Sequence, residues 1–498
     1  MMRKSLFNFV LILFGSALYV NLFWQEQLGL NALLFSLFAI AAAWWRWPEA
    51  LRREEVQVLI GGTVLSALLT VWHNSLLAKT AHVLSFLLLI GYLQQEKVRF
   101  VVFALLLGLA NVLETPLTLA RSLKDTLPRR SNWQTAARWA QLALLPLGLG
   151  TVFAFLYYHA NPRFALAFDF LWRRLSFSFE WILLGERLWP LLRGIFVMAG
   201  LLGASHLALL ASGIERKLPF SLNRRQKRFY LWPPGMLSLR NEYQASLIAF
   251  GLLNGLLFLA NIADLRYVWI SYGSATPQEL SQYVHEGTYL LIFAILLAMA
   301  AVIWYFRGNL NFYPENAWLR GLAFLWLAQN AMLALSVGLR NWHYVAHYGL
   351  AYKRLGVFWF LSLVLYGLYT LFRKVKEQKS LSFLLHCNGW AAYVALILFS
   401  FVNWDLAITR YNLKANMPGE IDARFLFEEV SDKNLYLLYQ CRDRLLEKSP
   451  LDEKGLEHAL REKRQGFTNR RQFLSWRSWN YADIRNEYFL AKAKPSRK

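Results

Sequence analysis

Charged residues and cysteines are both scarce in this sequence. Only 17% of its 498 residues are charged, whereas about a quarter of a soluble globular chain usually is. The two cysteines, Cys387 within an apolar run and Cys441 near the C-terminus, are too few and too differently placed for a disulfide framework. These shortages argue against an ordinary soluble domain and against a small disulfide-stabilised fold.

Signature motifs of common enzyme classes are also missing. The sequence contains no GxxxxGK[ST], no GxGxxG after a strand, no GxSxG, no CxxC and no HExxH. Nothing therefore indicates a nucleotide, a redox dithiol or a catalytic zinc, and no cofactor is expected. Whether the protein is an enzyme is left uncertain, with the sequence leaning toward no enzymatic activity.

Long uncharged apolar runs are what the sequence has in abundance. Hydrophobic residues make up 56% of the chain, and runs such as 56–72, 291–306 and 357–372 approach the roughly 20 residues that cross a bilayer. The sequence therefore predicts an all-α, polytopic transmembrane helical bundle with a small, mostly helical C-terminal domain outside the membrane. The N-terminal run follows MMRKS and is interpreted as an uncleaved first span. We expect about twelve spans, near 5–23, 28–45, 56–73, 79–94, 100–119, 140–158, 190–212, 243–262, 287–306, 318–338, 355–372 and 381–402.

The cations predict how the chain crosses the membrane. Residues 214–240 carry seven lysines and arginines against one acidic residue, and such loops face the cytoplasm. This choice places residues 263–286, the loop 339–354 and everything from 403 onward outside the cytoplasm. The basic loops of the first five spans give a conflicting orientation, which the sequence does not resolve.

The net charge of +23 suggests contact with anionic lipid headgroups rather than nucleic acid, because the cations lie mostly in short loops. The expected partners are the lipid bilayer and, through the C-terminal segment, an envelope protein. The candidates for headgroup contact are Arg224, Arg225, Lys227 and Arg228.

Three regions follow from this pattern. Residues 1–120 form N-terminal transmembrane segments, and residues 121–402 form the core of the membrane region. Within that core, 163–189 is expected to lie in the interface, since two adjacent arginines make spanning costly, and 214–240 is the basic cytoplasmic loop. Residues 403–498 form the non-cytoplasmic helical tail, with 18 basic and 13 acidic residues in 412–498.

Polar residues gather at the predicted non-cytoplasmic ends of the spans, where a single polar layer beneath the tail is plausible. They are candidates for a ligand or partner site, with Glu286 and Asp405 as the expected carboxylate partners of the arginines. The set is His285, Glu286, Arg340, His343, Tyr344, Tyr348, Arg354, Asp405 and Arg410.

Two other interpretations of this layer stay open. His343 and His347 lie one helical turn apart, and with His285 and Glu286 they offer donors that zinc accepts. Histidine, tyrosine and tryptophan are also common at a membrane interface for structural reasons. A structural network is favoured over a ligand site, and a metal site is the weakest of the three.

Within the spans, Asn111 and Glu114 lie one turn apart and His206 lies in an apolar run. A carboxylate at that depth can relay protons or bind a cation. Polar groups there more often form hydrogen bonds between helices.

Several short motifs together resemble a known family. Arg340, Tyr344, Tyr348–Leu350 and Arg354 fit R-x-x-x-Y-x-x-x-Y-G-L-T-x-x-R, although Ala351 stands where the pattern has threonine. The other matching segments are Ala160–Pro162, Tyr283–Gly287, Asn403–Asp405, Ile408–Asn412 and the tail stretch WRSWNYADIR (476–485). The chain thus resembles bacterial multi-pass membrane proteins described as a domain of unknown function (the DUF4153/DUF4173 type). The resemblance implies a helical fold in the bacterial cytoplasmic membrane and no established reaction.

The favoured function is a non-enzymatic envelope scaffold or sensor with a polar ligand or partner site at the non-cytoplasmic face. A secondary transporter or channel-like protein is the alternative and needs a polar path through Glu114 or His206. A membrane-embedded transferase is third and needs a pocket converging on His285, Glu286 and His343.

Overall fold

In the computed structural model, regular structure among the described residues is helical, apart from an isolated bridge between Ser221 and Lys379. The all-α expectation is therefore confirmed for this part of the chain. The structure describes residues 2–94, 98–114, 163, 166–170, 188–203, 218–222, 239–270, 287–414 and 421–492.

Six of these helices are long and apolar enough to cross a membrane: Glu54–His73, Leu76–Leu93, Leu239–Ile270, Ala317–Tyr348, Tyr352–Lys376 and Leu381–Ser400. Shorter apolar helices lie at Phe7–Phe23, Leu30–Arg46, Val101–Val112, Pro190–Leu202 and Tyr289–Tyr305. The predicted span 140–158 and most of the predicted interfacial helix 163–189 lie outside the described residues.

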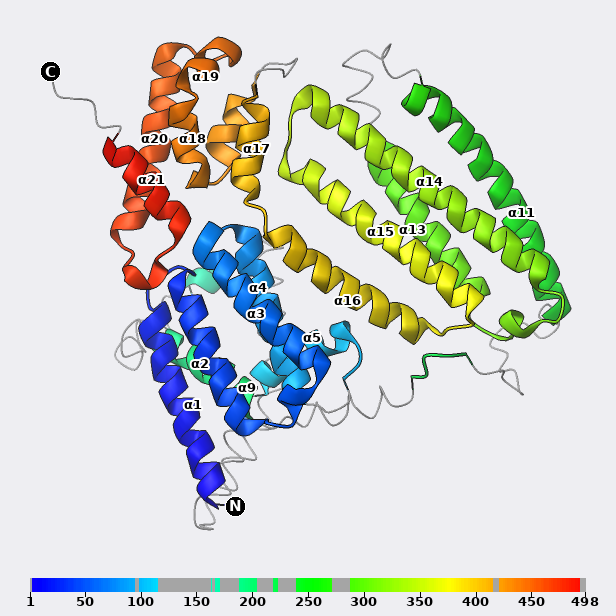
Figure 1. Ribbon diagram of the computed structural model, residues 1–498, viewed down its shortest axis with the longest axis horizontal. Helices are drawn as coiled ribbons and strands as arrows, with labels where there is room; N and C mark the ends of the chain where they lie inside the picture. Colours follow the sequence, from blue (N-terminus) through cyan, green and yellow to red (C-terminus); the bar gives the residue numbers. More distant parts are fainter. Residues whose placement is uncertain are drawn as a thin grey trace.

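The N-terminal helices pack around one hydrophobic core, drawn in blue and cyan in Figure 1. They are α1 (Met2–Phe23), α2 (Leu30–Arg46), α3 (Glu54–His73), α4 (Leu76–Leu93), α5 (Val101–Leu113) and α9 (Leu188–Leu202). Gly91 lets α4 and α5 approach closely, because a Cβ there would collide with the backbone oxygen of Ala104. Ser75 begins α4 by accepting a hydrogen bond from the backbone of Ala78.

A second core lies among the green and yellow helices of Figure 1. These are α11 (Leu239–Asp264), α13 (Gly287–Tyr305), α14 (Ala317–Tyr348) and α15 (Tyr352–Lys376), with a π-helical turn η2 (Leu265–Ile270) after α11. Helix α16 (Leu381–Ser400) belongs to both cores, because Phe383 and Leu384 contact the second and Tyr393 and Ile397 the first. We call α1–α16 the bundle.

The predicted loop 339–354 is mostly helix. Helix α14 continues ten residues beyond the predicted end at 338, to Tyr348, and the turn to α15 comprises only Gly349–Ala351. The apolar run ends at Gly338, but the backbone hydrogen bonds of the helix continue until Gly349. A prediction from side-chain polarity alone therefore ended the helix too early in the sequence.

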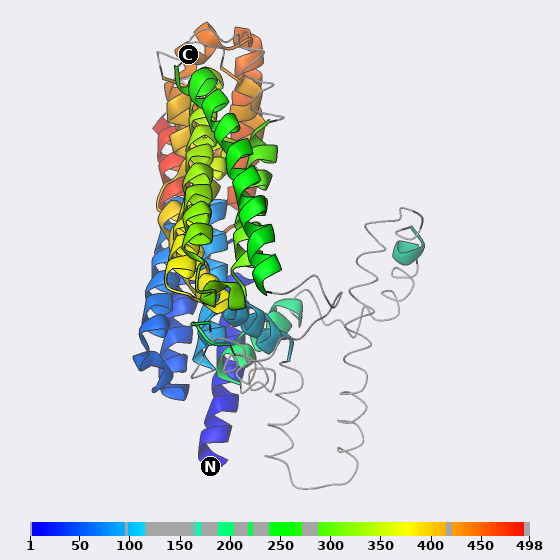
Figure 2. The ribbon, with the colours of Figure 1, turned by 90° about the vertical axis from the view of Figure 1, so that its right-hand side faces the viewer.

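Residues from 403 onward, which we call the tail, form a layer of short helices at one end of the bundle (Figures 1 and 2). The described elements are α17 (Trp404–Asn412), η5 (Phe425–Glu429), η6 (Asp432–Asn434), α18 (Leu435–Gln440), α19 (Arg442–Lys448), α20 (Glu453–Gln472), η7 (Trp476–Ser478) and α21 (Tyr481–Lys492). Leu426, Leu438, Leu445 and Leu456 are buried in a third, small core, which also includes Leu355 of α15.

Hydrogen bonds fix which loops lie at the tail end of the bundle. The backbone N–H of Leu30 donates to Trp479 (3.0 Å), and the ring of His73 bonds to the carbonyl of Phe401 (2.7 Å). The loop between α1 and α2, the α3–α4 connection and the α14–α15 turn all meet the tail or the segment leading to it.

Other loops meet at the opposite end. Trp47 donates to the carbonyl of Leu201 (3.1 Å), Ser380 to that of Phe220 (2.7 Å) and Gln378 to that of Asn311 (3.0 Å). Residues 218–222, which are described within the basic segment 214–240, thus lie at the end of the bundle away from the tail.

Candidate functional site at the junction of bundle and tail

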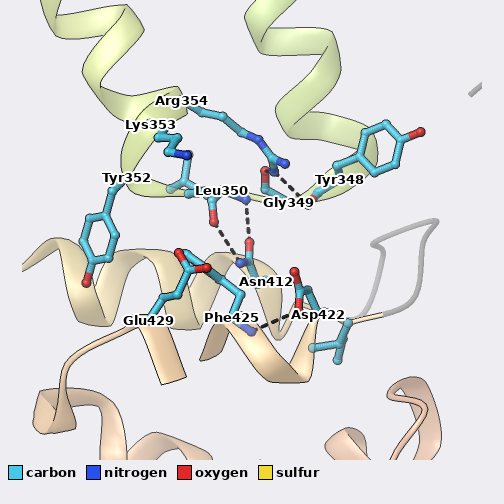
Figure 3. Close-up of a pocket in the computed structure, with 12 residues that line it drawn as sticks. Tyr348, Gly349, Leu350, Tyr352, Lys353, Arg354, Asn412, Asp422, Phe425 and Glu429 are labelled. Atoms are coloured by element: carbon cyan, nitrogen blue, oxygen red, sulfur yellow. Dashed lines mark hydrogen bonds between the residues drawn. The ribbon is translucent and has the colours of Figure 1, made fainter. Parts of the chain in front are cut away.

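Gly349 ends α14 and starts the turn drawn in Figure 3. Its backbone angles, φ 81° and ψ −179°, belong to a region that only glycine adopts without strain. The side chain of Arg354 then closes the turn from α15, donating to the carbonyls of Tyr348 (2.8 Å) and Gly349. Its guanidinium also lies over the ring of Tyr344, 4.4 Å from the centroid. The arginine thus stabilises a helix end rather than pairing with a carboxylate.

Asn412, the last residue of α17, connects this turn to the tail. The backbone N–H of Leu350 donates to its Oδ1 (2.6 Å), and its Nδ2 donates to the carbonyl of Leu350 (2.9 Å). Both hydrogen-bonding groups of one backbone residue are satisfied by a single amide (Figure 3). Two segments 62 residues apart in sequence are held together in this way.

Asp405 is the buried carboxylate of the junction. It lies in the first turn of α17, where the helix dipole favours a negative charge. Its two oxygens accept hydrogen bonds from the hydroxyls of Tyr352, on α15, and Ser431, in the tail. The expectation that an arginine pairs with Asp405 is wrong, because two hydroxyls from different parts of the fold occupy its oxygens.

The remaining arginines of the predicted polar layer have other partners. Arg340 forms a buried ion pair with Asp264 at the end of α11. Arg410 donates to the hydroxyl of Tyr436 (3.1 Å). The predicted layer is therefore several separate clusters, and only the one that contains Tyr348, Arg354 and Asp405 surrounds the turn.

The two histidines of α14 have different surroundings, and only His347 contacts this cluster. His343 hydrogen-bonds to the backbone of Val268 in η2, and His347 packs edge-on against Tyr348 with ring centroids 4.7 Å apart. Throughout the described chain, no group of three or more His, Cys, Asp or Glu residues is arranged to hold a metal ion.

A small cavity of about 360 Å³ lies over the turn. Residues 348–354 form one wall, and the tail residues Asp422, Phe425 and Glu429 form the other (Figure 3). Its lining combines apolar groups with polar ones, and Asp422 and Glu429 on the tail side are exposed.

A larger cavity of about 1020 Å³ lies between the bundle and the tail. Tyr352 and Glu429 line both cavities, and Asp405 lines the larger one. Its walls come from the start of α4, the start of α15, the segment from α16 to α17, and the tail elements η5, η6 and α20.

Four charged residues on the tail side of the larger cavity form a compact network. Lys433 pairs with Asp483, and Arg470 pairs with Asp432 (2.8 Å) and Asp483 (3.0 Å). Burial acts to raise the pKa of Asp483, but Lys433 and Arg470 outweigh it and hold the pKa well below its ordinary range. The network is internally balanced, with two positive and two negative charges.

Lys463 of α20 reaches back into the tail. Its ammonium donates to the carbonyls of Leu426 (2.7 Å), Phe427 (3.1 Å) and Val430 (2.8 Å), at the end of η5. Burial lowers the pKa of Lys463 to about 8. The lysine therefore shapes the cavity wall that carries Glu429 and Ser431.

The other predicted residues lie elsewhere in the bundle or outside the described residues. Asn111 and Glu114 are buried at the end of α5, in the N-terminal part of the bundle. Seven more candidates lie outside the described residues: His206, Arg224, Arg225, Lys227, Arg228, His285 and Glu286.

A family model, "Domain of unknown function (DUF4153)", matches residues 56–440, which is more than half of the chain. The chain belongs to this family. No curated protein and no solved structure matches it. The resemblance drawn from the turn motif and the α17 motif is thereby confirmed.

The DUF4153 region ends within the tail, at the end of α18. It includes Tyr352, Asp405, Asn412 and Ser431, so the hydrogen bonds that Asp405 and Asn412 form across the junction lie inside the family region. Lys463, Arg470 and Asp483, which complete the larger cavity and its charge network, lie beyond it.

Sequence reasoning missed several DUF4153-region and tail residues at the junction. Asn74 and Lys79 lie on either side of the start of α4, and neither belongs to a motif or a charge cluster in the sequence. Lys433 and Lys463 are hidden among the many charges of an apparently solvated tail, and Asp483 lies in the tail motif at 476–485, which gave no indication of its partners. One signal was available in the sequence. The mixed-charge run at residues 428–433 is short and has apolar segments on both sides.

Proposed function

We propose that the protein is a multi-pass membrane protein of about twelve spans in the bacterial cytoplasmic membrane. The tail forms a non-cytoplasmic domain, and the basic segment 214–240 lies in the cytoplasm near anionic lipid headgroups. Six membrane-length helices support the first statement. The separation of the tail and residues 218–222 at opposite ends of the bundle supports the second, since cation-rich loops stay in the cytoplasm.

Labelling Cys441 tests this orientation. In a Cys387→Ser background, a membrane-impermeant thiol reagent should label Cys441 in intact spheroplasts, because the residue is partly exposed in the tail. A cysteine introduced at Ser221 should be labelled only in inside-out vesicles. The reverse pattern would invert the proposed topology.

We further propose that the bundle and tail together act as a non-enzymatic scaffold or sensor. The observation that carries this is the buried carboxylate of Asp405, which accepts one hydroxyl from the bundle and one from the tail beside a large cavity. A ligand or partner that enters the cavity meets both parts at once. Occupancy therefore changes how firmly the tail is docked, which is the physical basis of a sensor.

The docking contact is tested by removing its hydroxyl donors. Tyr352→Phe and Ser431→Ala each leave Asp405 buried with one donor fewer, at a cost of about 1.5–3 kcal/mol for a hydrogen bond to a charged group. We expect tail cleavage by trypsin to accelerate about tenfold or more, as local opening becomes easier. Tyr369→Phe, at an exposed tyrosine of the same helix, is the matched control and should cleave like the wild type.

An unchanged cleavage rate in both variants would contradict the scaffold and sensor proposal. Transport remains the second candidate, supported by the buried pair Asn111 and Glu114. Solute flux in proteoliposomes that Glu114→Gln abolishes would favour it instead.

A further inference from the structure

The larger cavity has two chemically different walls. Much of the apolar wall comes from bundle helices that carry membrane-length apolar runs, with Trp404 and Phe427 added by the tail, and the polar wall comes mainly from the tail and the α3–α4 connection. The apolar lining includes Leu76, Leu355, Trp359, Phe399, Trp404 and Phe427. An occupant that satisfies both walls has a hydrocarbon part and a polar end.

Asn74 indicates where the polar end of such an occupant would bind. The residue ends α3 in the left-handed conformation (φ 51°) and is only 3% exposed. Asn74 is one of the residues that line the cavity, and neither Nδ2 nor Oδ1 of its buried side chain has a hydrogen-bond partner among the described residues. Because buried polar groups are almost always hydrogen-bonded, this amide points to a ligand group that completes it.

Lys79 supplies the charge beside that amide, one turn into α4. The cavity has three other cations, and all have partners: Lys433 and Arg470 bind carboxylates, and Lys463 binds three carbonyls. Within the described chain, the ammonium of Lys79 has neither a hydrogen bond nor an ion pair. Among the acidic residues of the lining, Asp405 already accepts two hydroxyls and Glu428 pairs with Arg424.

We propose that this cavity binds an anionic amphiphile, a lipid whose phosphate is held by Lys79 and Asn74 while its hydrocarbon chain lies against the apolar wall. A phosphate offers the several acceptor oxygens that an ammonium and an amide donor require. The volume of about 1020 Å³ is at the upper end for ligand sites, roughly 300–1,000 Å³. The proposal rests on the proposed function and names the ligand class that the sensor detects.

Two glycines allow the cavity to be filled without disturbing its walls. Gly356 of α15 and Gly466 of α20 line it from the bundle and from the tail, and a Cβ at either position meets no atom within 4 Å. Gly321 of α14 is equally open but lies outside the cavity lining. The three positions therefore form a matched set of two tests and one control.

The experiment measures binding to the purified full chain by native mass spectrometry. The probes are phosphatidic acid, phosphatidylcholine with the same acyl chains, and inorganic phosphate. We expect phosphatidic acid to bind at least about tenfold more tightly than phosphatidylcholine, as expected for a charge-assisted contact. Lys79→Gln should remove this preference, Gly356→Leu and Gly466→Leu should abolish binding, and Gly321→Leu should leave it unchanged.

Three results would overturn the inference. These are equal binding of both lipids, a preference that survives Lys79→Gln, or inorganic phosphate competing as well as the lipid, which would make the ligand a soluble phosphate. The docking assay with Tyr352→Phe uses no added lipid. If it succeeds while lipid binding fails, only the ligand class is wrong; if it fails while lipid binds, the sensor proposal is wrong.

Discussion

At the scale of single residues, the junction is built from charges that serve the backbone. Arg354 and Lys463 both direct their cations at carbonyl oxygens at the ends of helical segments, a position where positive charge is favourable. Asp405 does the reverse at the start of α17. These contacts join a charged side chain to the backbone at a helix end, so a count of opposite charges along the sequence does not reveal them.

The lowered pKa of Lys463 can be tested by measuring stability as a function of pH. Its pKa is about 8 in the folded protein instead of the ordinary 10.5, so between these values the unfolded chain binds the proton more tightly. Stability from this residue therefore rises as pH increases from about 8 to about 10.5. The shift in melting temperature of the purified protein between pH 7.5 and 9.5 should be more positive in the wild type than in Lys463→Met. Equal shifts in the two proteins would contradict the lowered pKa.

At the scale of elements, the turn between α14 and α15 depends on one backbone conformation. Gly349→Ala places a Cβ on a residue with φ 81° and ψ −179°, which costs about 1–3 kcal/mol. We expect a lower melting temperature and weaker protection of the Leu350 amide in hydrogen exchange, since that amide bonds to Asn412. Gly321→Ala, in the second turn of α14, serves as the control and should be neutral or slightly stabilising. A Gly349→Ala protein as stable as this control would rule out the conformational requirement.

Apolar runs predicted the helices well but not where they end. The spans predicted at 56–73 and 381–402 match α3 and α16 closely, because the first charged or turn-forming residue coincides with the helix end. At α14 the prediction stopped ten residues early, since Arg340 and His343 look like loop residues until Asp264 and Val268 supply their partners. Those partners come from a helix about 75 residues earlier, and no local pattern contains that information.

The candidate site was predictable only in part, for the same reason. Tyr348, Arg354, Asp405 and Asn412 were found through short motifs, although the arginine partner expected for Asp405 was wrong. Asn74 and Lys79 had no distinguishing context. Their importance arises from a cavity that three distant parts of the chain enclose.

At the scale of the whole molecule, the tail is docked onto the N-terminal helices as well as onto the α14–α15 turn. Glu26, between α1 and α2, accepts hydrogen bonds from the backbone of Ser475 and the hydroxyl of Ser478. Trp72 of α3 stacks on Tyr481 with centroids 4.9 Å apart. These contacts tie the end of the tail to the α1–α2 loop and to α3.

Removing Glu26 should release the end of the tail selectively. Glu26→Ala loses hydrogen bonds to a charged group, each contributing about 1.5–3 kcal/mol. Trypsin cleavage near Arg477 should then accelerate by about tenfold or more, while cleavage near Arg442 changes little. Glu49→Ala, at an exposed glutamate near the opposite end of the bundle, is the control. Uniform acceleration along the tail would show general unfolding and would contradict selective release.

The charge network of Lys433 has a practical consequence for dividing this protein into pieces. The family region stops at residue 440, and a chain cut there keeps Lys433, which is 4% exposed, but discards Asp483 and Arg470. Only Asp432, 3.6 Å away, would remain to neutralise a lysine that has lost the segment carrying the other two members of its network. The boundary that a shared sequence pattern defines is therefore not an autonomous folding boundary, and a minimal fragment must extend at least through α21.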